Sequence, residues 1–356
     1  MDGFEGVIIA EQSVLDAWTA ECGDLDPVAV DTEGDSLHCY REKLCLIQMS
    51  TANATVLIDP LSPLNFAGFK GMLQARTVVL HGCDYDLRML RRGIQFSPGP
   101  VFDTYLGARL LGLKEVGLAS LVQQYFGVQL PKTSQKANWS RRPLTPVMVS
   151  YAMNDTRHLL PLAERIGEQL RQLGRWDWFE ESCSRAIEAA GEDRERDPEK
   201  AWKVSGSAAL RGQALAVLRA LWFWREAEAE QVDRPTFQIL RNEEMVEIAE
   251  AAGQGKIVTP HYLTAGRRRR FQEALHVALA MPERDWPKRE HVIRSRLSLE
   301  QEKRLEALKQ RRDRVAAELQ LDPGVVAPKQ ALERLMREPD AINSALMRWQ
   351  RTVLDI

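Results

Sequence analysis

The segment Val28-Ala29-Val30-Asp31-Thr32-Glu33-Gly34 (VAVDTEG, residues 28–34) decides the fold of this 356-residue chain. Its first three residues form a short apolar run, typical of a buried strand, that leads directly into two acids. Side chains two apart on a strand point to the same face, so Asp31 and Glu33 can reach one common ligand while Thr32 faces the other way. For this pair alone, the alternative is a turn capped by Asp31 with Glu33 exposed.

The rest of the first half alternates strand-like and helix-like segments. Short apolar runs bounded by polar or turn residues predict buried strands at 28–30, 44–49, 55–58 and 78–80. Helical periodicity predicts helices at 14–22, 64–73, 84–91, 104–111, 118–126 and 146–170. Strands that are close in sequence, with helices around them, favour an α/β domain with a mixed sheet.

A third acid follows the strand predicted at 78–80. The segment HGCDYDL contains both Asp84 and Asp86. Asp84 is the better placed of the two to cap the following helix, where a carboxylate accepts backbone N–H groups. We therefore expect Asp86 to be the residue that reaches a common site, and His81 to make packing or hydrogen-bonding contacts.

A tyrosine and a fourth acid lie on the last long helix of this region. Tyr151 and Asp155 are four residues apart in SYAMND, so they share one helical face. A phenol beside a metal-bound carboxylate can position an attacking water; taking its proton is a separate question, because free tyrosine titrates near 10. Taken alone, the pair also fits a buried tyrosine with a satisfied hydroxyl and a surface acid.

Taken together, the four acids and Tyr151 indicate a chemistry that none of these motifs indicates alone. Four carboxylates at these spacings suit two hard divalent cations, which prefer oxygen ligands and can hold a phosphodiester between them. Magnesium or manganese fits such all-oxygen ligation. The set predicts a nuclease.

Composition narrows the class of protein. The 44% apolar and 28% charged fractions are those of a globular chain, and 48 basic residues nearly balance 50 acidic ones. Between Lys256 and Arg314, however, 16 Lys and Arg stand against 8 Asp and Glu, so this part carries +8 and the remainder −10. An acidic part joined to a basic part fits a metal-carboxylate enzyme with a polyanion-binding appendage; solvated helical faces are the alternative.

Other features bear on location. The five cysteines form no CxxC pair and no zinc-spaced Cys/His cluster, which fits a reducing cytoplasm. The N-terminal segment lacks the basic region of a signal peptide, and no apolar run approaches the length of a membrane span. We therefore expect a cytoplasmic protein that has no membrane partner. We also expect it to be a monomer.

The second half is predicted to be helical. Residues 191–200 (GEDRERDPEK) are charged and apolar-poor, as in a linker or an exposed helix end. From Gly206 onward the pattern is helical almost throughout. Residues 218–240 can be aligned with residues 305–326, since each has an arginine-bearing helix followed by an Asp-then-Pro turn and a hydrophobic pair, which suggests a degenerate repeat.

These motifs together resemble the ribonuclease D family, within the DEDD superfamily of 3′-to-5′ exonucleases. The resemblance covers nearly the whole chain and rests on the segments 28–50, 78–90, 101–112 and 136–162. By position, the family's four metal-binding acids match Asp31, Glu33, Asp86 and Asp155. Tyr151 matches the tyrosine of the "y" branch. Gly34 departs from the family, in which a bulkier residue is common, and this leaves open how the terminal base is wedged.

The resemblance implies a domain plan. A ribonuclease H-like exonuclease domain, a mixed sheet flanked by helices, is expected at 1–175, followed by a linker at 176–205. An all-α HRDC domain is expected at 206–290, and a second, degenerate HRDC-like domain at 297–356. The implied function is two-metal-ion removal of nucleotides from RNA 3′ ends, with release of nucleoside 5′-monophosphates. Transfer RNA precursors are the implied substrate class.

Two further sets of residues carry weaker predictions. The four consecutive arginines Arg267, Arg268, Arg269 and Arg270 fit either a phosphate-contacting patch or a solvated helix start. Trp222 and Trp224 lie about 200° apart on a helix, so at least one of them belongs to a core rather than to a base-stacking platform. Asp103 is predicted to be a helix N-cap, with a role near the substrate as the alternative, and His158, like His81, a packing or hydrogen-bonding residue rather than a metal ligand.

Alternatives to a ribonuclease stay open at this point. Nothing in the sequence separates ribose from deoxyribose, so single-stranded DNA is an alternative substrate. A non-catalytic nucleic-acid-binding protein on a nuclease scaffold is disfavoured, because all four acids and the tyrosine are present. A Rossmann-type enzyme would have GxGxxG after the first strand, where this chain has DTEGDS.

Overall fold

The computed structural model describes residues 5–131, 133–192, 197–289 and 297–356. These residues group into two compact units. The first unit falls within residues 1–34, 43–192 and 295–356, and the second within residues 35–42 and 193–294. The first unit is therefore assembled from segments that the second unit separates in sequence.

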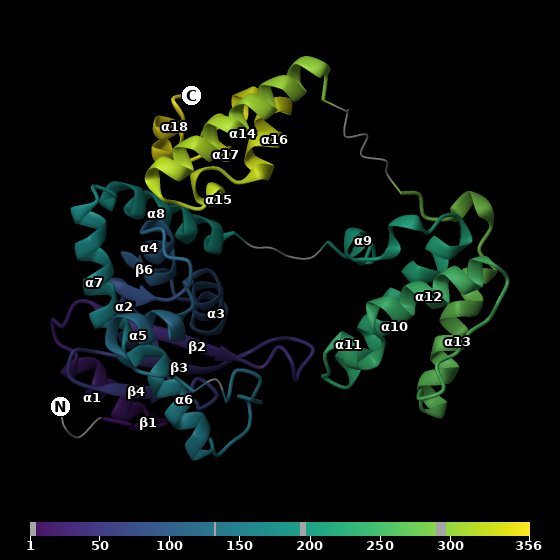
Figure 1. Ribbon diagram of the computed structural model, residues 1–356. Helices are drawn as coiled ribbons and strands as arrows, with labels where there is room; N and C mark the ends of the chain where they lie inside the picture. Colours follow the sequence, from purple (N-terminus) through teal and green to yellow (C-terminus); the bar gives the residue numbers. More distant parts are fainter. Residues whose placement is uncertain (1–4, 132, 193–196, 290–296) are drawn as a thin grey trace. The chain divides into compact units, whose positions relative to one another are not determined.

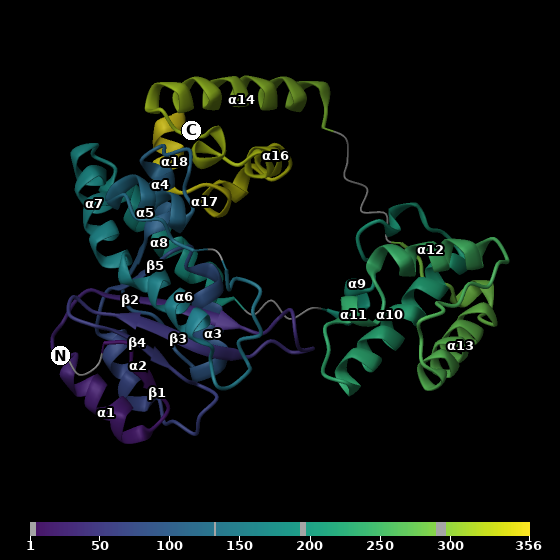
Figure 2. The same ribbon diagram turned by 60° about the horizontal axis from the view of Figure 1, so that its bottom comes forward.

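A mixed sheet forms the centre of the first unit, with the strand order β1-β4-β3-β2-β5-β6 (Figures 1 and 2). Its strands are β1 (Ile8–Ile9), β2 (Val28–Gly34), β3 (Leu44–Ser50), β4 (Thr55–Ile58), β5 (Val78–Leu80) and β6 (Val101–Asp103). Strand β3 is antiparallel to both neighbours, whereas every other neighbouring pair is parallel. Asp31 pairs with Gln48 and Glu33 with Leu46 across β2 and β3, and the register shifts between Glu33 and Gly34.

Helices cover both faces of the sheet because the strands alternate between two apolar layers. Val28 and Val30 face a core shared with α1 (Gln12–Glu21), α2 (Ala67–Gln74) and α3 (Asp84–Ile94). Ala29 and Val79 face a second core, shared with α4 (Thr104–Leu110), α5 (Leu118–Phe126), α7 (Leu159–Gln172) and α8 (Trp176–Gly191). Helix α6 (Pro146–Arg157) covers β3 and β4 on the face of Leu46 and Leu57. By alternation, Asp31 and Glu33 share this second face with Ala29.

Residues 297–356 pack against α8 of the same unit. They form α14 (Leu299–Leu319), α15 (Pro323–Val326), α16 (Lys329–Arg337), a 3₁₀ turn (Pro339–Ala341), α17 (Ile342–Ala345) and α18 (Arg348–Leu354). The rings of Trp178 and Trp349 stack with centroids 4.8 Å apart, and Glu181 accepts the first backbone N–H groups of α18 at 2.6 and 3.1 Å. A carboxylate at a helix N-terminus satisfies donors that have no partner within the helix.

The second unit is helical. It contains α9 (Pro198–Ala201), α10 (Gln213–Gln231), α11 (Thr236–Ile239), α12 (Asn242–Gly253) and α13 (Ala265–Leu279), with 3₁₀ turns at Ser207–Ala209 and Glu283–Asp285. Its core is built around α10, which packs on α12 and α13. Trp222 and Trp224 are 8% and 7% exposed, so both belong to this core and neither offers a stacking platform.

The predicted fold class is confirmed, and its four strands are present. The prediction missed β1 and β6, which are too short to show a period in sequence. The single helix predicted at 146–170 is wrong, because the chain breaks at His158 into α6 and α7. Pro161 marks this break in the sequence, because a proline has no N–H to donate to the carbonyl of Arg157 but is tolerated in the first turn of α7.

The linker predicted at 176–205 is also wrong over its first part. Residues 176–191 form α8, which covers the β6 edge of the sheet and contacts α3, α4 and α7. Phe179 and Cys183 are 2% and 3% exposed, so this helix belongs to the core of the first unit. Residues 193–196 and 290–296 lie outside the described residues. Among the helices that the structure describes, none is both long and apolar enough to cross a membrane.

Candidate active site

Three of the predicted acids meet where β2 ends. Asp31 and Glu33 leave the same face of β2, and Asp155 comes from α6, which packs over that face. One carboxylate oxygen from each of these three residues lies within 4.8 Å of the other two. The structure thus brings together groups that are more than 120 positions apart in the sequence.

Asp86 reaches the same region from the opposite layer of helices. It lies in the first turn of α3 and is 4% exposed. Its Oδ1 accepts the backbone N–H of Thr32 at 3.0 Å and the Thr32 hydroxyl at 2.6 Å. Thr32 lies between Asp31 and Glu33 on β2, so these two bonds fix Asp86 beside that strand. Asp86 is not one of the three acids within 4.8 Å.

The structure separates Asp86 from Asp84. The predicted N-cap role of Asp84 is wrong, since Cys83 occupies that position and Asp84 begins the helix. The carboxylate of Asp84 pairs with Arg88, four residues later on α3. Asp84 is thereby neutralised on the helix surface, whereas Asp86 faces the other acids.

Tyr151 and Asp155 lie one helical turn apart on α6, as predicted. The helix begins at Pro146, and the hydroxyl of the N-cap residue Thr145 accepts the backbone N–H of Met148. The Tyr151 hydroxyl hydrogen-bonds the side chains of Asp155 and Gln135. The ring of the buried Trp139 lies 6.1 Å from that of Tyr151, between centroids. Tyr151 is therefore fixed both at its ring and at its hydroxyl.

A salt bridge holds the segment that supplies Gln135 and Trp139. The guanidinium of Arg142 donates to both carboxylate oxygens of Asp59, each at 2.6 Å, and to the carbonyl oxygens of Cys45 and Trp139, each at 2.7 Å. Asp59 follows β4 directly and is 6% exposed. This bidentate pair anchors the segment to β3 and to the end of β4, beside α6.

The four carboxylates raise one another's pKa. Burial, followed by the charges of Asp86, Asp155 and Glu33, raises the pKa of Asp31 well above its usual range. Burial and the neighbouring acids raise the pKa of Glu33 to about 9. Burial raises the pKa of Asp86 and of Asp155 to about 7, against hydrogen bonds from Thr32 and Tyr151 respectively.

The basic residues that the structure describes do not neutralise this cluster. Within the described residues, no lysine, arginine or histidine forms an ion pair with Asp31, Glu33, Asp86 or Asp155. Buried charges are normally paired or coordinate a metal ion. A set of oxygen donors without a built-in cation therefore fits hard divalent cations and would bind them in its ionised form.

Two other predictions of the sequence concern neighbouring residues. Asp103 is confirmed as an N-cap: its Oδ1 accepts the backbone N–H groups of Tyr105 and Leu106 at 2.9 and 3.3 Å. His81 is confirmed as a hydrogen-bonding residue, with its Nδ1 2.9 Å from the Thr104 hydroxyl. Neither belongs to the acidic cluster.

The four predicted arginines lie on α13 of the second unit, where the chain engages all four. Arg267 and Arg270 both pair with Glu228, whose side chain is 3% exposed. Arg268 donates to the carbonyl oxygens of His261 and Leu263, and Arg269 pairs with Glu273. Arg267 and Arg270 thus neutralise a buried acid, a role that sequence could not reveal because Glu228 lies about 40 positions earlier.

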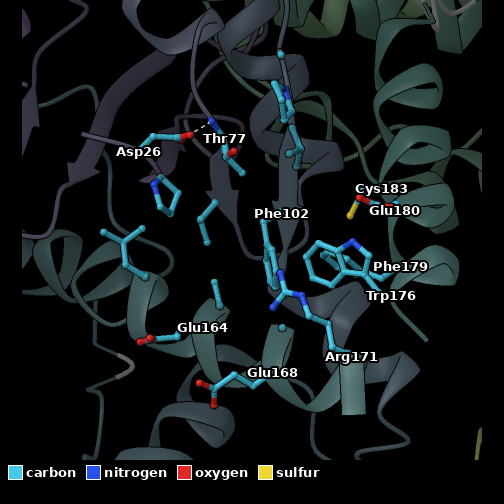
Figure 3. Close-up of a pocket in the computed structure, with 18 of the residues that line it drawn as sticks. Asp26, Thr77, Phe102, Glu164, Glu168, Arg171, Trp176, Phe179, Glu180 and Cys183 are labelled. Atoms are coloured by element: carbon cyan, nitrogen blue, oxygen red, sulfur yellow. Dashed lines mark hydrogen bonds between the residues drawn. The ribbon is translucent and has the colours of Figure 1, made fainter. Parts of the chain in front are cut away.

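A cavity of about 1190 Å³ lies elsewhere in the first unit, among residues that precede β2, β5 and β6 and residues of α7 and α8 (Figure 3). Its aromatic wall includes Phe102, Trp176 and Phe179, and the Arg171 guanidinium lies 3.9 Å from the centroid of the Trp176 ring. Asp31 and Glu33 lie at the other end of β2, and no member of the acidic cluster lines this cavity. The cavity and the cluster are therefore separate features.

Comparison with known proteins agrees with this geometry. A 3′-5′ exonuclease family model matches residues 7–171, and an HRDC domain model matches residues 214–255. Ribonuclease D of Sphingobium indicum is 32% identical over 299 residues, which are 79% of this chain and 76% of that protein. Ribonuclease D of Pseudomonas paraeruginosa is 30% identical, over 91% of this chain and 89% of that protein.

Solved structures share the fold over almost the whole chain. A protein from Bifidobacterium adolescentis superposes with a TM-score of 0.78, covering 98% of this chain and 97% of that one at 23% identity. Escherichia coli RNase D, described as an exoribonuclease involved in structured RNA processing, gives a TM-score of 0.72, with 98% of each chain covered at 23% identity. Enzymes of this exonuclease family depend on divalent metal ions. The chain belongs to the ribonuclease D family, and it is a 3′-to-5′ exoribonuclease.

Proposed function

We propose that Asp31, Glu33, Asp86 and Asp155 hold two divalent cations, Mg²⁺ or Mn²⁺, with which the enzyme hydrolyses the last phosphodiester of an RNA strand. The observation that carries this proposal is the convergence of Asp31, Glu33 and Asp155 within 4.8 Å, with no ion pair from a lysine, arginine or histidine of the described residues. When bound, such a cation pair lowers the pKa of a water molecule and stabilises the charge that develops on the leaving 3′ oxygen. The product is a nucleoside 5′-monophosphate.

Asp31 is central to this arrangement. The charges of Asp86, Asp155 and Glu33 all raise the pKa of Asp31, so Asp31 interacts electrostatically with each of the other three acids. We propose that Asp31 would be the central member of the carboxylate set that holds the cations. Asp86, which Thr32 holds by two hydrogen bonds, then supports one side of the site, and Asp155 supports the other.

Tyr151 has the geometry of a positioning group. Burial and the neighbouring acids raise its pKa above the ordinary value of tyrosine, so the phenol keeps its proton. A neutral hydroxyl that is fixed by Asp155 and Gln135 can orient the attacking water. We propose this role for Tyr151; bound cations would supply the acidity of that water.

We propose that the substrates are structured RNAs with a 3′ tail, and transfer RNA precursors in particular. The HRDC domain supports nucleic-acid contact by the second unit, and the structurally similar Escherichia coli enzyme is involved in structured RNA processing. Of the four arginines, Arg269 is the best placed for phosphate contact, with its side chain 76% exposed. Residues 297–356 repeat the order of a long helix, a four-residue helix and a third helix seen in α10, α11 and α12, which supports a second HRDC-like domain.

The experiment that tests the function compares substrates and metals side by side. A transfer RNA with a 3′ extension, an unstructured RNA and a single-stranded DNA are each incubated with the enzyme and Mg²⁺, Mn²⁺ or EDTA. We expect nucleoside 5′-monophosphates from the RNA 3′ end with either metal and none with EDTA. Faster digestion of the DNA than of both RNAs would refute the substrate assignment, and activity in EDTA would refute the metal site. Size-exclusion chromatography of the same sample tests the expected monomer.

A further inference from the structure

Gln48 is a buried polar residue that the proposed reaction does not yet use. It lies at the centre of β3 and is 0% exposed. Both polar atoms of its side chain, Nε2 and Oε1, have no hydrogen-bond partner among the described residues. Buried amides are almost always hydrogen-bonded, so an orphaned glutamine in the middle of a sheet requires an explanation.

The register of the sheet places Gln48 beside the acidic cluster. Gln48 is directly opposite Asp31 across the antiparallel pair β2–β3, and the register shift occurs beyond this pair, between Glu33 and Gly34. Opposed residues of an antiparallel pair project from the same face, with Cβ atoms about 4.5–5.5 Å apart. The Gln48 amide and the Asp31 carboxylate therefore leave neighbouring strands side by side.

The other neighbours of Gln48 offer it little. Across β4 its partner is Leu57, and α6 covers this face with the apolar side chains of Met148 and Ala152. Ser50, the next residue of β3 on this face, already bonds the hydroxyls of Thr55 and Thr156. Of the two residues that lie directly opposite Gln48 on neighbouring strands, Asp31 and Leu57, only Asp31 has a side-chain acceptor.

We propose that Gln48 is a positioning residue of the active site, whose Nε2 donates a hydrogen bond to the Asp31 carboxylate when that carboxylate binds cations. This inference rests on the proposed function of Asp31. A carboxylate that ligates a metal ion is normally held by a further hydrogen bond that fixes its orientation. The Thr32–Asp86 pair shows the same device on the other side of β2.

The test is a substitution that removes the donor but keeps the volume. We expect Gln48→Met to weaken Mn²⁺ binding about 10-fold or more, measured in the absence of RNA by the loss of the free Mn²⁺ signal in electron paramagnetic resonance. The Mg²⁺ concentration for half-maximal activity should rise in parallel, while KM for a short RNA at saturating Mg²⁺ stays unchanged. In EDTA, thermal unfolding of Gln48→Met should occur at the same or a higher temperature, because an unpaired buried amide has been removed.

Two controls make the outcome decisive. Gln350→Met removes another buried glutamine, which donates to the Val325 carbonyl at 2.9 Å and accepts from the Met347 N–H at 2.8 Å. It should lower the unfolding temperature and leave Mn²⁺ affinity unchanged. Asp31→Asn should abolish tight Mn²⁺ binding, and retention of that binding would instead overturn the metal site itself.

Unchanged Mn²⁺ affinity in Gln48→Met, with Asp31→Asn impaired, would overturn the positioning role alone. If Gln48→Met does not fold, Gln48→Leu is measured in the same way, and the metal-induced rise of its unfolding temperature replaces the resonance signal. A rise equal to that of the unsubstituted enzyme would overturn the inference. A smaller rise would support it.

Discussion

The two units differ in how their buried acids are neutralised. In the second unit, Glu228 is almost fully buried, but Arg267 and Arg270 neutralise it, and their hydrogen bonds lower its pKa. In the first unit, Asp31, Glu33, Asp86 and Asp155 crowd together, no lysine, arginine or histidine of the described residues pairs with them, and their pKa values are raised. An acid that the chain neutralises stabilises the fold. Acids that no described basic residue neutralises hold protons more tightly, as their raised pKa values show, and are free to bind the cations proposed for this site.

The largest effect expected from this contrast concerns activity. Asp31→Asn or Asp155→Asn should reduce hydrolysis of an RNA 3′ end by at least about 10³-fold, because each removes a ligand charge from the cations. Folding should be preserved, since a neutral amide relieves repulsion within the cluster; the unfolding temperature in EDTA should be equal or higher. Turnover of purified Asp155→Asn at the unsubstituted rate in Mg²⁺ would show that the assignment is wrong.

Removing the neutral member of the cluster should have an intermediate effect. Tyr151→Phe keeps the ring beside Trp139 but removes the hydroxyl that bonds Asp155 and Gln135. We expect kcat to fall about 10²-fold, within the range for one positioned acid–base group, with Mn²⁺ affinity unchanged. A large loss of Mn²⁺ affinity would instead make the hydroxyl part of the support for Asp155.

Substitution of Glu228, the neutralised acid, should affect stability rather than activity. Glu228→Gln should destabilise the second unit by about 1–3 kcal/mol, because it removes charge-assisted hydrogen bonds to two arginines. Urea unfolding measures this change, and digestion of a short unstructured RNA should proceed at the unsubstituted rate. A loss of that activity with unchanged stability would mean that Glu228 has a role other than neutralising α13.

The contrast between the acidic cluster and Glu228 also predicts that their contributions to stability change with pH in opposite directions. The folded pKa values of Glu33 (about 9), Asp86 and Asp155 (each about 7) lie above their unfolded values near 4, so the metal-free folded state binds more protons between these limits. Their contribution to stability is full below pH 4 and is lost as pH rises through 7 to 9. The unfolding temperature in EDTA should therefore fall by several degrees between pH 6 and pH 9.

Metal ions and substitution give the controls for this pH response. Mg²⁺ or Mn²⁺ should reduce the fall, because bound cations favour the ionised acids. Asp155→Asn should also flatten it. The pKa of Glu228 is lowered, so its contribution is present above its unfolded pKa and is lost as pH falls further into acid. A metal-free protein that gains stability from pH 6 to pH 9 would contradict the electrostatics of the cluster.

The smallest effect is expected at the exposed arginine. Arg269→Ala should leave stability within about 0.5 kcal/mol, because its pair with Glu273 is exposed. If Arg269 contacts a phosphate, RNA affinity should fall a few-fold and the slope of log affinity against log salt should fall by about 1. Arg270→Ala serves as the comparison, since it should chiefly lower stability. An unchanged salt slope in Arg269→Ala would remove the proposed contact.

Sequence alone was sufficient for features that depend on neighbours in the chain. The alternation in VAVDTEG placed Asp31 and Glu33 on one face, and the spacing of Tyr151 and Asp155 placed them on one turn of a helix. Sequence was insufficient where a partner comes from elsewhere. The pairing of Gln48 with Asp31 depends on strand register, and the bond from Thr32 to Asp86 crosses 54 positions.

The prediction from sequence also failed at helix boundaries, where two possible local interactions compete for one side chain. Asp84 has the residue type of an N-cap, but it forms an ion pair with Arg88 in a helix that starts one residue earlier than the capping pattern requires. The break at His158 could have been predicted from Pro161, which is tolerated only in the first turn of a helix, whereas the burial of α8 follows from packing on the sheet. Tertiary contacts decide such burial, and a single sequence does not display them.

The stacking of Trp349 on Trp178 has a consequence for biosynthesis. The surface of α8 is completed by residues that the ribosome adds only after the whole of the inserted helical unit has been made. A nascent chain that has extruded its nuclease sheet must therefore wait for roughly 150 further residues, about ten seconds or more at ordinary elongation rates, with that face of α8 uncovered. Chaperones that bind exposed apolar surfaces during translation would bind this face of α8.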